Sequence, residues 1–283
     1  PIDAISMASK NCFDYYKMGN EFGGIGPGKI ADILILDNYK KIKINKVILG
    51  GKIVVSNGKI LEIIHSPKIP TWIQKTVKLP KLTTENFILT SKNNTETVNI
   101  ISMKTEIVTK KDTTNLSVKD FNVMASYDKD IWKVTAMDRT FGSKTKTIGF
   151  LKNFGADVGA FASTWSFHEN DMIVIGSNEK DMADAANKLV KSQGGLIVVK
   201  NGKTLASLPF QMGGIISTDS IDKVTTNFTK INDVLLDSGC KFKKPHLIPL
   251  FLPFLALPDI RILFSGVVDV KARKFIPTIQ TTV

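Results

Sequence analysis

The densest run of polar side chains in the sequence lies between two apolar segments. Residues 166–171 read Ser-Phe-His-Glu-Asn-Asp and follow the small, mostly apolar segment 159–164. Such segments predict buried strands, and the loops between buried strands are where folds present functional side chains. His168, together with Glu169 or Asp171, has the groups needed for general acid–base catalysis or for binding a polar ligand. A solvated turn would have the same composition, so both interpretations remain open.

The histidines are too few and too scattered to predict a metal centre. The sequence has three, His65, His168 and His246, with no His-x-His pair and no His-Glu-x-x-His motif. A hydrolytic zinc or iron site needs three or four nitrogen or oxygen ligands around one point. We therefore interpret His65 and His246 as ordinary residues and expect no metal or other cofactor within this chain.

Two other familiar arrangements are absent from the sequence. There is no Gly-x-Ser-x-Gly motif and no phosphate-binding motif Gly-x-x-x-x-Gly-Lys-Ser/Thr. The glycine cluster at 23–28 leads into an apolar strand rather than a helix, which removes the helix N-terminus that binds phosphate. Asp138 and Arg139, just before Gly142, are either a structural ion pair or an anion clamp, and the structural interpretation is favoured.

The chain is basic, with a formal net charge of +12, yet nucleic-acid binding is not predicted. Only Arg139, Arg261 and Arg273 are arginines, whereas base recognition and bidentate phosphate binding favour arginine. The lysines are scattered and form no long run of like charge. A lysine-rich, solvent-exposed surface is the simpler interpretation.

The composition favours a cytoplasmic protein that does not enter a membrane. No uninterrupted apolar run reaches the roughly 18 residues that a spanning helix needs. The chain opens on Pro1 and Ile2 without the basic and apolar regions of a secretory leader. Cys12 and Cys240 are too few and too far apart in sequence for a disulfide framework, so both are expected to be reduced.

Residues 1–64 predict one helix followed by short antiparallel strands. The helix is expected over 1–18, because proline suits the first helical position and the apolar residues after it have helical spacing. Tight turns are expected at Gly50–Gly51 and Asn57–Gly58. The strands are expected at 31–36, 47–49, 52–55 and 59–64. These strands are too few for a stable sheet, so they need partners from elsewhere.

The polar, proline-containing stretch 67–97 predicts a linker, and the remainder, 98–283, predicts an α+β fold. Strands outnumber helices, and the hairpins indicate a mixed, largely antiparallel sheet with helices on one face. The expected strands are a pair over 98–110, single strands at 132–136, 146–151, 159–164 and 172–175, and a hairpin over 196–208 turning at Asn201–Gly202. The tail after Val270 is expected to be an edge strand or an extension. The expected helices are 179–193, with Asn178 as N-cap, and 219–238, capped by Ser217 or Thr218 and burying Ile221, Val224, Phe228, Ile231 and Leu235.

The N-terminal third resembles the metal-dependent amidohydrolases. The segment 26–36, reading Gly-Pro-Gly-Lys-Ile-Ala-Asp-Ile-Leu-Ile-Leu, is similar to the re-entry of such enzymes into their small β-sandwich. Residues 1–11 resemble the last helix of their (β/α)8 barrel, and residues 47–61 resemble the closing sandwich hairpin. The resemblance implies that 1–24 is that last helix and that 25–66 is a partial amidohydrolase β-sandwich, with the rest of the barrel upstream of Pro1.

The second half resembles the C-terminal α/β domain of adenine deaminases, which we assign to 98–283. The similar segments are Asp138–Arg139 and residues 155–162, 181–187, 194–203 and 255–270. The resemblance implies hydrolysis of adenine to hypoxanthine and ammonia by a water activated on a divalent metal (Mn, Fe or Zn) in the barrel. It also implies a homo-oligomer, a purine base as substrate, and no activity for this chain without the barrel portion.

One departure from that family concerns the polar run. Members of the family carry His-Asp-Ser-His-Asn where this sequence reads Phe-His-Glu-Asn-Asp over 167–171. Aligned without gaps, both family histidines are replaced, and a shift by one residue restores only the first. This pattern indicates a divergent branch. A module that binds a purine or a partner without catalysis is the alternative hypothesis.

Overall fold

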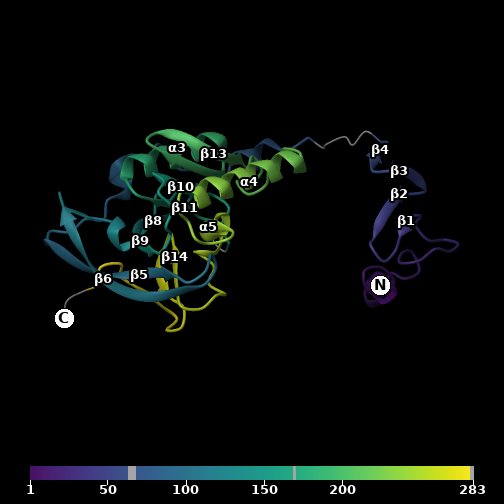
Figure 1. Ribbon diagram of the computed structural model, residues 1–283, viewed down its shortest axis with the longest axis horizontal. Coiled ribbons are helices and arrows are strands. Elements are labelled where there is room, and N and C mark those ends of the chain that lie inside the picture. The colour runs from purple at the N-terminus through teal and green to yellow at the C-terminus, as the bar shows by residue number, and fades with distance from the viewer. Residues whose placement is uncertain (63–67, 168–169, 281–283) are drawn as a thin grey trace. The chain divides into compact units, whose positions relative to one another are not determined.

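The computed structural model describes residues 1–62, 68–167 and 170–280, and the chain forms two compact units, Pro1–Lys68 and Ile69–Val283 (Figure 1). Helices and strands are both present in each unit, and the sheets are antiparallel or mixed. The predicted α+β class is therefore confirmed. Among the described residues, no helix combines the length and the apolar composition needed to cross a bilayer.

The first unit contains two short helices and one antiparallel sheet. The helices are α1 (Ile2–Met7) and α2 (Lys10–Tyr15), and the strands, in sheet order, are β1 (Ile33–Asn38), β2 (Lys43–Leu49), β3 (Lys52–Ser56) and β4 (Lys59–Ile60). The prediction of one continuous helix over 1–18 is wrong. The helix breaks at Ser9, whose hydroxyl donates to the carbonyl of Ile5 at 2.6 Å and so competes with the backbone ladder.

The first unit has no core of its own in the part of it that the structure describes. No residue among 1–62, nor Lys68, is buried. Apolar strand residues face solvent instead: Leu34 is 56% exposed, Leu49 52% and Ile53 45%. A small sheet with this much open apolar surface needs a covering surface to be stable.

The second unit is built on a mixed sheet of nine strands. Its order is β13-β12-β10-β11-β8-β9-β5-β6-β7, and of the described pairings in it only β5 with β9 is parallel. The strands are β5 (Thr95–Met103), β6 (Thr109–Lys119), β7 (Asn122–Val123), β8 (Ile131–Met137), β9 (Lys146–Lys152), β10 (Ala160–Ser163), β11 (Met172–Gly176), β12 (Gly195–Lys200) and β13 (Lys203–Pro209). The strands predicted at 132–136, 146–151, 159–164 and 172–175 and the hairpin turn at Asn201–Gly202 are confirmed, whereas the pair expected over 98–110 is longer, because β6 continues to Lys119.

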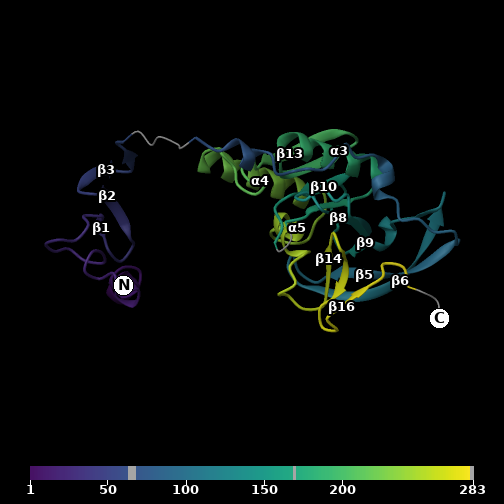
Figure 2. The ribbon, with the colours of Figure 1, turned by 180° about the vertical axis from the view of Figure 1, so that it is seen from behind.

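A smaller sheet and several helices complete this unit (Figure 2). The sheet runs β14 (Ile260–Leu263), β15 (Gly266–Asp269) and β16 (Lys274–Ile276), and β16 is the edge strand expected after Val270. The α-helices are α3 (Glu179–Ser192), α4 (Ile221–Asp237) and α5 (Ile248–Phe251), and the short 3-10 helices are η1 (Thr71–Gln74), η2 (Thr84–Phe87), η3 (Tyr127–Lys129) and η4 (Pro245–Leu247).

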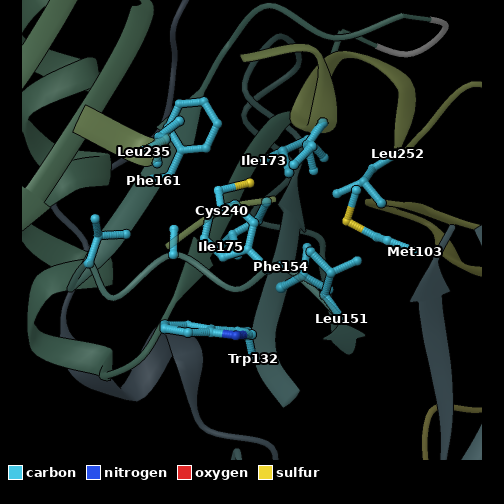
Figure 3. Close-up of a cluster of buried hydrophobic side chains, with 14 of the residues drawn as sticks. Met103, Trp132, Leu151, Phe154, Phe161, Ile173, Ile175, Leu235, Cys240 and Leu252 are labelled. Atoms are coloured by element: carbon cyan, nitrogen blue, oxygen red, sulfur yellow. The ribbon is translucent and has the colours of Figure 1, made fainter. Parts of the chain in front are cut away.

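The helices cover both faces of the large sheet, so the prediction of helices on one face is wrong. Along β10, Ala160 and Ala162 pack with α3, whereas Phe161 between them packs with α4. Successive strand residues point to opposite faces, so the two helices lie on opposite sides. Figure 3 shows part of the α4 side, where Phe161 and Ile173 of the sheet gather with Leu235 of α4.

The expected linker at 67–97 does not hold for residues 69–97, which belong to the second unit. Val77, Leu79, Leu82 and Phe87 are buried in the cluster beneath α3. Asn187 of α3 fixes this segment with two hydrogen bonds, accepting from the Leu82 N–H at 2.9 Å and donating to the Leu82 carbonyl at 2.8 Å. The apolar residues are spaced among lysines and prolines, which is why the stretch resembles a linker in sequence.

The two long helices agree with their predictions to different degrees. Asn178 caps α3, its side chain accepting from the Asp181 N–H at 2.8 Å, as expected. The helix α4 begins later than expected, with Ser220 as N-cap. Ile221 is 75% exposed rather than buried, whereas Ile231 and Leu235 are fully buried. The apolar spacing was therefore right for the second half of α4 and wrong for its first turn.

A buried lysine joins four segments of the second unit. The Lys133 ammonium donates to the Glu179 carboxylate at 2.6 Å, to the Asn122 side chain at 2.7 Å and to the Phe87 carbonyl at 3.1 Å. Burial lowers the pKa of Lys133, and Glu179 opposes that shift. Burial also acts to raise the pKa of Glu179, but Lys133 and Asn122 outweigh it and the net shift is downward. All three ammonium protons have acceptors, as a buried charge requires.

Replacing Lys133 with methionine is expected to destabilise the protein by about 3 kcal/mol, because Glu179, Asn122 and the Phe87 carbonyl lose a buried partner. Urea unfolding followed by circular dichroism measures the loss. Lys200→Met is the control, since the ion pair of Lys200 with Asp157 is exposed and is expected to contribute at most about 1 kcal/mol. Equal losses in the two variants would contradict the assignment of Lys133 as a structural junction.

Candidate functional site

The polar loop predicted from the sequence lies at one end of the nine-stranded sheet. At this end β8 and β10 finish, and β11 and β12 begin; Met137 pairs with Met172, and Ser163 pairs with both Ile173 and Leu196. Loops from four neighbouring strands therefore meet here. We refer to this region as the sheet-end site.

Of the three candidate residues, only Asp171 belongs to the described part of the chain; His168 and Glu169 lie outside it. Asp171 is fully buried just before β11. Its carboxylate accepts the Phe264 N–H at 2.8 Å, and its carbonyl accepts the Ser166 hydroxyl at 2.8 Å. Asp171 thus ties the polar loop to the turn between β14 and β15. A role in binding substrate stays a prediction.

Asp138 organises the loop that follows β8. Its carboxylate accepts the N–H groups of Thr140 at 3.0 Å, Phe141 at 2.9 Å and Ser143 at 3.0 Å. Burial acts to raise the pKa of Asp138, but the hydrogen bonds from Ser143, Phe141 and Thr140 outweigh it, so the pKa lies below its ordinary value. The described ion pairs include none between Asp138 and Arg139, so the predicted pair between these neighbours is wrong.

Arg139 points a buried guanidinium into the sheet-end site. The residue is 2% exposed, and within the described part of the chain its Nε has no hydrogen-bond acceptor. Burial lowers the pKa of Arg139 to about 10, and the charge of Asp171 opposes the shift. The backbone carbonyl of Arg139 accepts the Lys78 N–H at 2.7 Å, which holds the chain in place on the other side.

Gly214 covers the Arg139 guanidinium because Thr164 fixes the loop that carries it. The Thr164 hydroxyl accepts the Gly195 N–H at 2.8 Å and donates to the Gly214 carbonyl at 2.6 Å. Gly214 has φ +73°, and a Cβ there would lie 2.7 Å from Arg139 Nη1. A side chain at this position would therefore meet the guanidinium, and the backbone conformation also favours glycine.

An aromatic groove adjoins the site beyond Thr164. It has a volume of about 360 Å³ and lies between Trp165, Phe210 and the start of α4, where Phe228 packs. The His246 ring lies parallel to Trp165 at 6.4 Å, and its Nδ1 is 2.8 Å from the Asn232 side-chain oxygen. Burial lowers the pKa of His246, because it disfavours the charged imidazolium. His246 is held by packing.

The described residues do not fit a metal centre. No group of three or more His, Cys, Asp or Glu side chains among them could hold an ion. The carboxylates of Asp138, the sequence neighbour of Arg139, and of Asp171, whose charge acts on Arg139, accept backbone N–H groups.

The fold and the sheet-end site define an α+β domain that carries a buried arginine and a buried aspartate. Sequence comparison identifies the family to which this domain belongs. The family described as "Adenine deaminase C-terminal domain" matches residues 106–274. The chain therefore belongs to the adenine deaminase family, and the predicted resemblance to a C-terminal portion is confirmed.

Curated relatives extend the match over the whole chain. The adenine deaminase of Cenarchaeum symbiosum (strain A) is 51% identical over 279 residues, which is 99% of this chain and 46% of the relative. That of Clostridium botulinum (strain ATCC 19397 / Type A) is 31% identical over 98% of this chain and 47% of its own length. That of Desulforamulus reducens is 30% identical over 100% and 48%, respectively. The chain spans about half the length of the curated relatives it matches.

Sequence reasoning missed the parts of the site that come from distant segments. Thr164 ends a predicted strand, and Gly214 lies in a loop, so neither had a local signal that linked it to Arg139. The consecutive residues Gly213 and Gly214, both with positive φ, mark a special backbone conformation. That signal indicates a tight turn but not what the turn covers.

Gly214→Ala is expected to cost roughly 2–4 kcal/mol, from about 1 kcal/mol of backbone strain and about 1–3 kcal/mol of overlap with the Arg139 guanidinium. Gly202→Ala is the matched control, because Gly202 has φ +74° and a Cβ there would have nothing within 4 Å. It should show the strain alone. Urea unfolding of both variants separates the two effects. An equal decrease in the free energy of unfolding would mean that the Arg139 guanidinium moves aside at no cost.

Asp138→Asn is expected to lower stability at pH 7 by about 1–2 kcal/mol, because a charged acceptor of three N–H groups becomes a neutral one. The folded pKa of Asp138 is below its ordinary 3.8, so its contribution is present above that value and is lost as pH falls through the folded pKa. The stability difference from the unmodified protein should therefore shrink in acid. Urea unfolding between pH 7 and pH 2.5 measures it; a constant difference would contradict this. Asp233→Asn, on the exposed side of α4, is the control.

Proposed function

We propose that this chain is the C-terminal part of an adenine deaminase-like hydrolase. In the complete protein, a metal-activated water would replace the amino group of adenine, giving hypoxanthine and ammonia. Membership of the adenine deaminase family supports the reaction. The match to only about half the length of each relative supports the proposal that the chain is one part of a longer protein. The divalent metal (Mn, Fe or Zn) would belong to the barrel portion.

The observation that carries the proposal is the open first unit. Its described residues include none that is buried, although its strands carry large apolar side chains such as Leu34 and Ile53. Burying apolar surface is the main favourable term in folding, so this sheet is stable only against another surface. A preceding barrel portion would supply that surface, and the first unit would then be its last helix and part of its β-sandwich.

Within that protein, the sheet-end site would contribute to the substrate side of the active site. We keep His168, Glu169 and Asp171 as the proposed substrate-site residues, with Asp171 holding the loop through Phe264. The departure from the family's two-histidine run supports a divergent branch of the family. A cytoplasmic location is part of the same proposal, supported by free cysteines at Cys12 and Cys240. A homo-oligomer is proposed from the family resemblance alone.

The alternative is a binding module without catalysis. One observation favours it: the second unit has three buried clusters of its own and does not need the first unit for a core. In that case the purified chain would bind a purine or a partner by itself. Heat on titration with adenine would support the module, and no heat would count against it.

The purified chain with Mn²⁺ and adenine is expected to release no ammonia. The chain matches 279 residues of the Cenarchaeum symbiosum adenine deaminase, and a chimera in which it replaces those residues is expected to restore ammonia release. A coupled ammonia assay measures both, with the unmodified relative as reference. Turnover by the chain alone would refute the division of roles. A folded but inactive chimera would refute adenine deamination as the shared activity.

A further inference from the structure

Arg139 differs from the other arginines of the chain in what surrounds its guanidinium. Arg261 is also buried, but four carbonyl oxygens accept from it, those of Leu257, Ile107, Phe251 and Pro258, at 3.1–3.4 Å. Arg273 is exposed. For Arg139, no hydrogen bond or ion pair of the guanidinium occurs among the described residues, and Nε is buried without an acceptor.

An unsatisfied buried cation is costly, so its presence needs an explanation. Leaving a buried donor without an acceptor costs about 1–3 kcal/mol, and more when the group is charged. The second unit does satisfy its other buried cations, since Lys133 has three acceptors and Arg261 has four. Groups that break such a rule are found where a ligand completes the site.

The described surroundings of Arg139 fix its backbone and pack against its guanidinium without accepting a hydrogen bond from it. Asp138 fixes the loop after it through three N–H groups, and Lys78 N–H holds its carbonyl. Gly214, fixed by Thr164, packs against the guanidinium without offering a side chain. A cation that is fixed in position loses little freedom on binding, which favours recognition of a ligand.

We propose that Arg139 is the binding group of an oxyanion site, for a carboxylate or a phosphate, at the end of the nine-stranded sheet. The planar fork of a guanidinium matches the paired oxygens of these groups. An anion also compensates the charge, which a neutral acceptor would leave in place. Burial lowers the pKa of Arg139, and the negative charge of Asp171 opposes that shift, as the charge of a bound anion would. The proposal does not depend on the deaminase activity.

The Nε–H signals of the arginine side chains test this directly, because the chain has only three arginines. The full chain, labelled with ¹⁵N, is titrated with sodium phosphate and, separately, sodium acetate, against sodium chloride at equal ionic strength. The Arg139 signal, identified by its loss in Arg139→Lys, is expected to shift and saturate with either oxyanion. The buried control Arg261 should stay fixed, and the exposed control Arg273 should respond to the three salts alike.

Thermal unfolding gives a second readout that needs no assignment. Phosphate at ten times its Kd is expected to raise Tm by roughly 3–6 °C in the unmodified chain. The increase should be smaller in Arg139→Lys, which keeps the charge without the fork, and absent in Arg139→Met. If the methionine variant fails to fold, the lysine variant and the titration of the unmodified chain still decide.

Three outcomes would overturn the proposal. Equal shifts of all three signals, or none that saturates, would mean an effect of ionic strength only. A response of Arg139 to adenine but to neither oxyanion would identify a site for a neutral acceptor. A shifted Arg139 signal in ligand-free Glu169→Gln, with no response of the unmodified chain to phosphate, would assign the partner to the chain's own carboxylate.

Discussion

The buried ammonium of Lys133 is the constraint on which the arrangement of the second unit depends. A charge removed from water must have every donor satisfied, and the three acceptors come from η2, β7 and the first residue of α3. Placing this one group therefore sets three segments around β8. The start of α3 then fixes the next hairpin, because Asp181 in its first turn accepts the N–H groups of Asn201 and Gly202 at 2.8 Å.

The residues that follow the end of α3 position the loops of the sheet-end site. The helix stops at Ser192, and Gly194 and Gly195 follow with positive φ. Gly195 donates to Thr164, and Thr164 holds Gly214 over Arg139. The site is thus positioned by a series of buried polar contacts that begins at the opposite end of α3. These loops need no regular structure, because residues at the ends of strands, such as Thr164 and Gly195, hold them in position.

Much of this fold was predictable where the signal is local. Apolar runs identified the central strands, Asn178 identified the start of α3, and Asn201–Gly202 identified a hairpin. Two features were not predictable for physical reasons. The spacing of apolar residues tells which side of a helix is buried, but not which face of a sheet it covers, so α3 and α4 were placed together. The segment 69–97 has its apolar residues separated by prolines and lysines, and only the surface of α3 shows that they are buried.

For the candidate site, the sequence identified a loop but not its chemistry. Asp138 and Arg139 looked like a pair because they are neighbours, yet successive residues of an extended chain point to opposite sides. Their side chains therefore have separate roles, one holding the following loop and the other entering the sheet-end site. The substrate role expected of Asp171 stays a prediction, and its contact with Phe264 joins residues 93 positions apart, which no local pattern reveals.

The open surface of the first unit has a thermodynamic consequence. Where a small sheet has no interior of its own among its described residues, the free energy that orders it comes from whatever covers it. Its folding and its association are then one equilibrium rather than two. A substitution at Leu34 or Ile53 would act on that equilibrium as a change at an interface does, and its effect would depend on the covering surface as much as on the strand itself.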